Sequence, residues 1–157
     1  MKWEVMRITR VYTIGFTKKT AEEFFDLLEK NNVKIVFDVR LNNSSQLAGF
    51  SKGRDLKYFL KKILSIDYIH DTNFSPTKEI LDNYKKGNIT WDTYEEKFYE
   101  LLKKREIEKY IDKDLNNKLD GICFLCSENT AEHCHRRLVA EYIKSIMKNE
   151  IIQIIHI

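Results

Sequence analysis

The sequence from residue 34 to residue 39 reads Lys34-Ile35-Val36-Phe37-Asp38-Val39, a nearly continuous apolar run. A strand that is buried on both faces has this pattern, and such strands occur mostly in parallel sheets. Two more strands are predicted at Ile8–Ile14, which is rich in β-branched and aromatic residues, and at Gly121–Cys126, the strongest strand pattern in the chain. The chain therefore indicates an α/β fold.

Helices are predicted between these strands, because apolar residues recur there at spacings of three and four. The predicted helices cover residues 21–30 after the capping residue Thr20, residues near 56–64, and a segment that begins near Cys134. Short strands are predicted at Asp67–His70 and Ile151–Ile157. Alternating strands and helices predict a three-layer α/β fold, with a mainly parallel or mixed sheet of about four to five strands and helices on both faces.

Residues 72–112 are predicted to be a helical insertion without strands, which caps one end of the sheet. One helix is expected to start at Ser75-Pro76, since serine caps helices well and proline suits the first helical position. Thr90 is expected to cap a longer helix that runs to about Tyr110.

Length and composition predict one soluble domain over residues 1–157, because 157 residues with 43% hydrophobic content suit a single core. The net charge of +3 favours anionic partners weakly and is far below that of a dedicated nucleic-acid binder. The apolar runs are too short to span a membrane, and residues 1–7 lack the apolar core of a signal peptide. Three cysteines are too few for a disulfide framework, so we expect free thiols and a cytoplasmic location.

Three polar motifs each stand at the carboxyl end of a predicted strand. They are Thr13-Ile14-Gly15-Phe16-Thr17, Asp38-Val39-Arg40 and Cys126-Ser127-Glu128, the last continuing to residues 133–137. In parallel α/β sheets these ends lie along one edge, and ligands bind in the crevice outside it. We therefore expect one site at this edge.

Anion binding is the predicted role of the arginines in these motifs. Arg40 offers a planar fork for a carboxylate or phosphate, and Asp38 either holds that fork or acts as a base. Arg136 is expected to hold the anion together with Arg40, and the Thr17 hydroxyl to touch it.

Cys134 is the preferred nucleophile, because a helix N-terminus should lower the pKa of its thiol. Cys126 is the alternative nucleophile. The side chains of Cys134 and His135 diverge by about 100° on a helix, so His135 is expected to transfer protons to substrate rather than to Cys134. Glu128 is expected to position groups or take protons.

A metal site and a redox C-x-x-C motif are both disfavoured. Cys123 and Cys126 lie three apart in a strand and should face opposite sides, which makes Cys123 a core residue. Zinc ligands are available in principle, but their spacing fits no usual zinc module: Cys126, His133, Cys134 and His135. No metal and no cofactor are expected.

These motifs, with the aromatic segment from Tyr84 to Tyr99, are similar in order and spacing to the family called domain of unknown function 488. The resemblance implies a compact α/β domain, found mainly in prokaryotes, without a settled activity. Its elements fall on seven residues of the predicted site: Asp38, Arg40, Cys126, Glu128, Cys134, His135 and Arg136. Phe16 stands where the family often has serine, and Leu41 stands where a proline is common.

The leading hypothesis is an enzyme that acts on an anionic small molecule, a nucleotide or a nucleic-acid end. A cysteine-dependent hydrolase or transferase is the class of enzyme that the residues suggest. One alternative is a nucleic-acid-binding module without chemistry, which would use a basic stripe: Lys52, Arg54, Lys57, Lys61 and Lys62. A second alternative is a thiol-based redox regulator in which Cys126 and Cys134 form a disulfide.

Overall fold

The computed structural model describes residues 6–44 and 48–157. Its centre is a five-stranded sheet in the order β3-β2-β4-β1-β5, with every neighbouring pair parallel. The strands are β1 (Ile8–Gly15), β2 (Ile35–Asp38), β3 (Asp67–His70), β4 (Ile122–Cys126) and β5 (Ile151–His156). The three-layer α/β prediction is confirmed, and the sheet is wholly parallel rather than mixed.

Six α-helices connect the strands, together with shorter helical turns. They are α1 (Ala21–Lys30), α2 (Gly53–Phe59), α3 (Lys78–Lys85), α4 (Trp91–Lys104), α5 (Ile107–Tyr110) and α6 (His135–Ile146). A π-turn at Leu60–Leu64 extends α2. The predicted helical insertion is confirmed and continues as turns to Lys118, just before β4.

Two predicted helix boundaries are wrong. Helix α3 begins at Lys78 with Thr77 as its cap, whereas the Ser75 hydroxyl donates to the Val39 carbonyl, 2.7 Å away, and so binds the end of β2. The long helix predicted up to Tyr110 is broken at Glu106, whose φ of 54° is left-handed. A left-handed residue cannot continue an α-helix, so α4 and α5 are separate.

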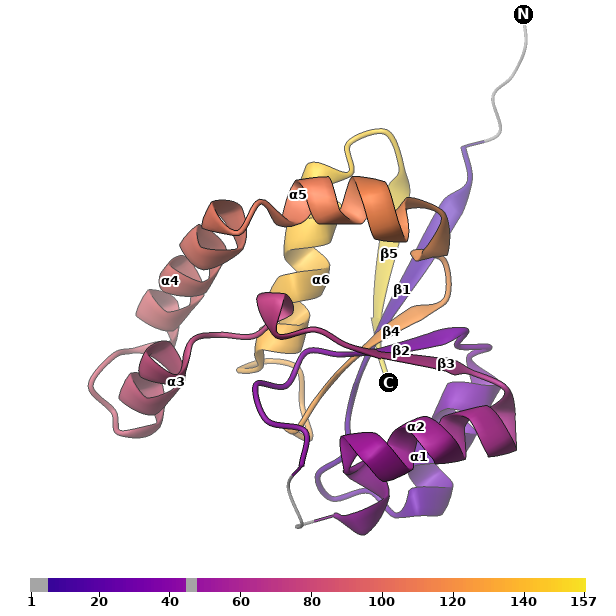
Figure 1. Ribbon diagram of the computed structural model, residues 1–157. Helices are drawn as coiled ribbons and strands as arrows, with labels where there is room; N and C mark the ends of the chain where they lie inside the picture. Colours follow the sequence, from indigo (N-terminus) through magenta and orange to yellow (C-terminus); the bar gives the residue numbers. More distant parts are fainter. Residues whose placement is uncertain (1–5, 45–47) are drawn as a thin grey trace, which may run out of the picture.

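Helices cover both faces of the sheet (Figure 1), and each face has its own hydrophobic core. Helices α1 and α2 cover one face, where Phe24 and Leu56 pack against the strands. Helices α5 and α6 cover the other face, where Leu138 packs with Phe37 and Phe124. Strand β4 lies in the middle of the sheet, so all five of its residues are buried.

The winding of the chain changes direction beside β4. The steps from β1 to β2 and from β2 to β3 run toward one edge of the sheet, and the steps from β3 to β4 and from β4 to β5 run toward the other. The connections that leave the carboxyl ends of the neighbours β2 and β4 therefore lead to opposite faces. In open α/β sheets such a position leaves a crevice in which ligands bind.

In the described part of the chain, none of the helices has the length and apolar composition needed to cross a membrane.

Candidate active site

A pocket of about 260 Å³ opens at the carboxyl ends of β2 and β4. The segment after β2, the segment after β4, the start of α6, and helices α3 and α4 all line it: Arg40, Leu41, Asn42, Leu81, Tyr84, Lys85, Trp91, Tyr94, Cys126, Ser127, Glu128, His133, Cys134 and His135. Four other hollows, of about 280 to 490 Å³, contain neither cysteine nor histidine. The predicted meeting of distant motifs at one edge is thus seen for Arg40, Cys126, Glu128, Cys134 and His135.

Asp38 and Arg40 form a buried ion pair at the end of β2. Arg40 Nε lies 2.9 Å from Asp38 Oδ1 and Nη2 lies 2.7 Å from Oδ2, and the two residues are 0% and 3% exposed. The Tyr68 hydroxyl donates to Oδ2 as well, 2.6 Å away. Both carboxylate oxygens are therefore engaged, and Asp38 is not among the residues that line the pocket. Of its two predicted roles, the geometry favours holding the arginine fork over acting as a base.

One nitrogen of the Arg40 guanidinium has no hydrogen-bond partner among the described residues. Its Nη2 also donates to the Ser51 carbonyl at 2.7 Å, and its Cζ lies 5.3 Å from the centre of the Phe16 ring. Its Nη1 is buried and has no hydrogen-bond partner among the described residues. Buried polar groups are nearly always hydrogen-bonded, so an unpartnered guanidinium N–H beside a pocket points to a missing acceptor.

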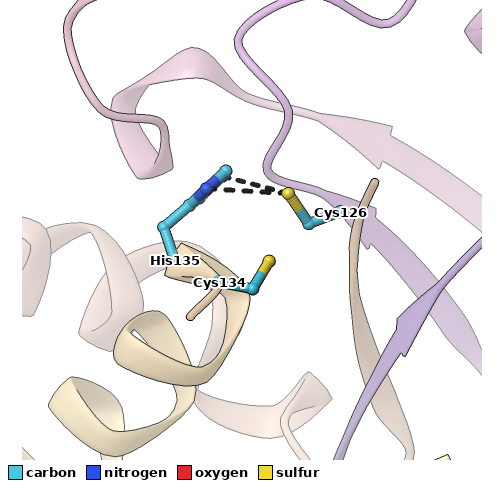
Figure 2. Close-up of side chains that lie close together, drawn as sticks. All are labelled: Cys126, Cys134 and His135. Carbon is cyan, nitrogen blue, oxygen red and sulfur yellow. Dashed lines mark hydrogen bonds between the residues drawn. The ribbon is translucent and has the colours of Figure 1, made fainter. Parts of the chain in front are cut away.

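Cys126, Cys134 and His135 form a compact cluster, with Sγ of both cysteines and a ring nitrogen within 4.8 Å of one another (Figure 2). His135 Nε2 lies 2.7 Å from the Val39 carbonyl, which can only accept, so Nε2 carries the proton. Cys126 Sγ lies 3.6 Å from Nδ1 and 3.7 Å from Nε2. A sulfur in the ring plane at these distances from both nitrogens would overlap Cε1, so the sulfur lies over the ring face. His135 is therefore no direct base for Cys126 in this arrangement.

The expectation that the helix start lowers the pKa of Cys134 is wrong. Burial raises the pKa of the Cys134 thiol well above its ordinary value, and its hydrogen bond to Cys126 raises it further. The same hydrogen bond lowers the pKa of Cys126 despite the opposing effect of burial, and the Ser127 backbone N–H and the Arg136 charge add to this lowering. These shifts favour Cys126 over Cys134, the preferred nucleophile of the sequence analysis, as the more acidic thiol of the pair.

The same three residues are the one group of three or more metal-ligand side chains found in the described residues. Two cysteines and a histidine can hold zinc and leave an open position. Here, however, the imidazole turns its face to Cys126 Sγ and its Nε2 proton to Val39, so the ring directs no lone pair at Cys126 Sγ. The other predicted ligand, His133, instead packs on Trp91, with ring centres 5.1 Å apart.

Arg136 and Thr17 hold the loop after β4 and do not line the pocket. Arg136 Nη1 donates to the Glu128 carbonyl at 2.6 Å, and the Thr17 hydroxyl donates to the Ser127 carbonyl at 2.5 Å. Direct contact of these two side chains with an anion stays a prediction: neither residue lines the pocket, although Arg136 Nε, like Arg40 Nη1, is buried without a hydrogen-bond partner among the described residues. Arg136 and Thr17 fix the backbone that carries Glu128, whose side chain is exposed at the pocket rim.

An aromatic wall from the helical insertion is the part of the site that sequence reasoning missed. Trp91 stacks on Tyr94, with ring centres 4.8 Å apart and planes at 17°, and Tyr84 packs edge-on against Trp91 at 5.5 Å. The sequence analysis used the aromatic segment from Tyr84 to Tyr99 for the family resemblance and assigned it no place in the site. The prediction that the insertion caps one end of the sheet was the signal that could have assigned them to a site there.

The comparisons with curated proteins and with solved structures returned no match. A family model, Domain of unknown function DUF488, matches residues 20–143, which is most of the chain. The matched segment contains Arg40, Cys126, Glu128, Cys134 and His135 and the aromatic wall. The resemblance drawn from the motifs is confirmed, and the chain belongs to the DUF488 family.

Proposed function

We propose that this protein is a cysteine-dependent hydrolase or transferase that acts on an anionic small molecule or nucleotide. One observation carries the proposal: the buried Nη1 of Arg40 has no partner in the described structure, and Arg40 lines the same pocket as Cys126. A phosphate or carboxylate oxygen is the acceptor that this N–H lacks.

In this proposal Cys126 is the nucleophile. Its sulfur bonds to an electrophilic atom of the bound substrate and a leaving group departs; water or a second substrate then releases the sulfur. Cys126 lies beside the amino end of α6, whose free N–H groups and dipole stabilise negative charge that develops there. Asp38 holds Arg40 in place, and Glu128 at the rim orients substrate groups or accepts protons.

The aromatic wall supports a substrate with a flat or apolar part next to its anionic group. Tyr84 and Trp91 are half-buried and line the same pocket as Arg40 and Cys126. A nucleoside phosphate combines both features, since its base packs on aromatic rings and its phosphate accepts hydrogen bonds from arginine.

The three free thiols support a reducing compartment such as the cytoplasm. The basic stripe of the nucleic-acid alternative lies on α2 and the turn that follows, outside the pocket lining. Lys61 of that stripe pairs with Asp67 at 3.2 Å. We therefore favour a small anionic partner.

Binding of inorganic phosphate and adenosine monophosphate, measured by calorimetry, tests the proposal. Arg40→Lys keeps the charge but loses the fork, and we expect it to weaken binding at least tenfold, about 1.4 kcal/mol. Arg54→Lys, a change at an exposed arginine of α2, is the matched control and should bind like the parent. The proposal fails if neither probe binds the parent protein or if Arg40→Lys binds both equally well.

A further inference from the structure

Two of the three cysteines share the pocket and the third is sealed from it. Cys126 ends β4 and Cys134 is the residue just before α6, and their sulfurs lie within 4.8 Å of each other (Figure 2). Cys123, on the same strand, is 0% exposed and packs in the core on the opposite face of the sheet. The structure therefore holds a pair of neighbouring thiols and an internal reference thiol.

We propose that Cys126 and Cys134 are a redox-active pair that reduces a hydroperoxide and closes to a disulfide. The Cys126 thiolate attacks the terminal oxygen of the hydroperoxide, so that an S–O bond forms, the O–O bond breaks and the alcohol leaves with a proton. Cys134 then loses its proton and its sulfur attacks Cys126. An S–S bond forms, the S–O bond breaks, and the hydroxide leaves with that proton as water. The hydroperoxide thus receives two electrons, and a dithiol reductant returns the pair to the thiol state.

The positions of the two residues fix the order of these steps. Both cysteines line the pocket, but Cys126 is the more exposed of the two, 6% against 2%, so a small hydroperoxide reaches its sulfur more easily. The lowered pKa of Cys126 agrees with this order. A thiolate, not a thiol, attacks peroxides and disulfides. Cys134 stays a thiol until Cys126 is oxidised, and it already lies next to the sulfur that it attacks.

The local backbone allows the sulfurs to close the remaining gap. A disulfide bond is about 2 Å long, so the side chains must rotate toward each other. Cys134 has extended backbone angles, φ −137° and ψ 134°, and its side chain makes no capping hydrogen bond that rotation would break.

The disulfide would also regulate the site, a consequence that rests on the proposed function. Oxidation removes the nucleophile and adds a covalent bridge between the end of β4 and the start of α6. Disulfide formation itself does not depend on that function, so a protein without affinity for phosphate should still form it. The two proposals can therefore fail separately.

Intact-mass spectrometry of the Cys123→Ala variant, which has only the two pocket thiols, tests the inference. After hydrogen peroxide we expect a loss of about 2 Da that a dithiol reverses. Cleavage after glutamate separates Cys126 from Cys134, because Glu128 and Glu132 lie between them, and should yield one linked peptide pair. If Cys123→Ala does not fold, the parent protein serves, with Cys123 expected to remain alkylatable after unfolding.

Two further variants test the order of attack. With Cys134→Ser, Cys126 should stop at the sulfenic acid and be labelled by dimedone. With Cys126→Ser, Cys134 should remain unlabelled and the mass unchanged. The inference is overturned if peroxide causes no reversible mass loss, if Cys123 of the oxidised parent protein can no longer be alkylated after unfolding, or if dimedone labels Cys134 in the Cys126→Ser protein.

Discussion

Asp38 shows how a single side chain can support both stability and a binding group. Its carboxylate accepts hydrogen bonds from Arg40 and Tyr68 in a place where neither charge of the ion pair is exposed. Removal of one partner from a buried pair leaves the other charge uncompensated, which costs far more than the loss of a surface pair. The carboxylate is thus required to keep a charged arginine inside the protein.

We expect Asp38→Asn to lower the free energy of unfolding by about 3–5 kcal/mol, because Arg40 would stay buried without a counter-charge. Urea unfolding measures the change. Asp67→Asn is the control, since the Asp67–Lys61 pair is 68% exposed on both sides and should contribute no more than about 1 kcal/mol. Equal losses in the two variants would contradict the assigned role of Asp38.

The thiol of Cys126 should react at lower pH than an ordinary cysteine. Its pKa is lowered from the usual 9.0, so the folded protein holds thiolate at pH values where an unfolded chain holds thiol. This thiolate stabilises the fold fully above pH 9, and the stabilisation is lost as the pH falls through the lowered pKa.

Alkylation by iodoacetamide at a series of pH values, followed by mass spectrometry of the modified residue, should give a midpoint below 9.0 for Cys126. Cys123 is the control, because burial raises its pKa and seals it in the core, and it should remain unmodified while the protein is folded. A midpoint for Cys126 at or above that of a free thiol would refute the expectation.

For single residues, the sequence predicted which side chains belong to the site better than it predicted which atoms they contact. It identified Asp38 and Arg40 as partners, because residues two apart in a strand share a face. It could not show that Thr17 and Arg136 donate to the backbone carbonyls of a loop, because the course of that loop depends on tertiary structure. It misjudged Cys134 because a helix start is visible in sequence and the burial that outweighs it is not.

Among the elements, the loop after β4 depends on the end of β1. A Cβ added to Gly15 would lie 1.6 Å from the Glu128 carbonyl oxygen, so only glycine permits this approach. The nearby Arg136 and Thr17 donate to the same loop. The position of Glu128 at the pocket is therefore determined by a residue without a side chain.

Gly15→Ala should push this loop away and destabilise the protein by about 1–3 kcal/mol, the usual cost of forcing extra atoms into a packed region. Thermal unfolding measures the loss. Gly49→Ala is the control, because an added Cβ there meets nothing within 4 Å, and its midpoint should hardly move. If Gly15→Ala had the same unfolding midpoint as the parent protein, the loop would be able to accommodate a methyl group at this position.

The elements themselves were largely predictable, since strand residues alternate with helices of clear 3,4 spacing. The errors fell where a tertiary contact decides. Ser75-Pro76 has the composition of a helix start, but the Ser75 hydroxyl donates a hydrogen bond to the Val39 carbonyl instead of capping a helix. The break between α4 and α5 at Glu106 could not be predicted, because no glycine or proline stands there in the sequence.

For the molecule as a whole, the two hydrophobic cores share one sheet, and β4 contributes to both. If the sheet came apart, the apolar side chains of both cores would be exposed to water. The covering helices on the two faces should therefore unfold together, as expected for one cooperative domain.

We predict that Trp91 fluorescence and far-ultraviolet circular dichroism give the same urea midpoint, the first reporting on α4 and the second on all helices. The Trp3→Phe background leaves Trp91 as the one tryptophan. Midpoints that differ beyond error would mean that the two faces unfold independently and that the one-domain prediction is wrong.

Strand order is the property of the whole molecule that the sequence could not supply. Each strand is recognisable alone, but nothing in the residues of β4 states that it pairs with β2 on one side and β1 on the other. This pairing places Arg40 beside Cys126. The motifs predicted a shared edge, and only the topology identifies which of them are neighbours.

The central place of β4 has a consequence for protein synthesis. Strands β1 and β2 leave the ribosome early but are not partners of each other, because the strand between them begins only at Ile122. A nascent chain that ends before that residue exposes the edges of both strands, a state in which unpaired strands tend to aggregate. Completion of the sheet, and with it of the pocket, has to wait until the codons for β4 have been translated.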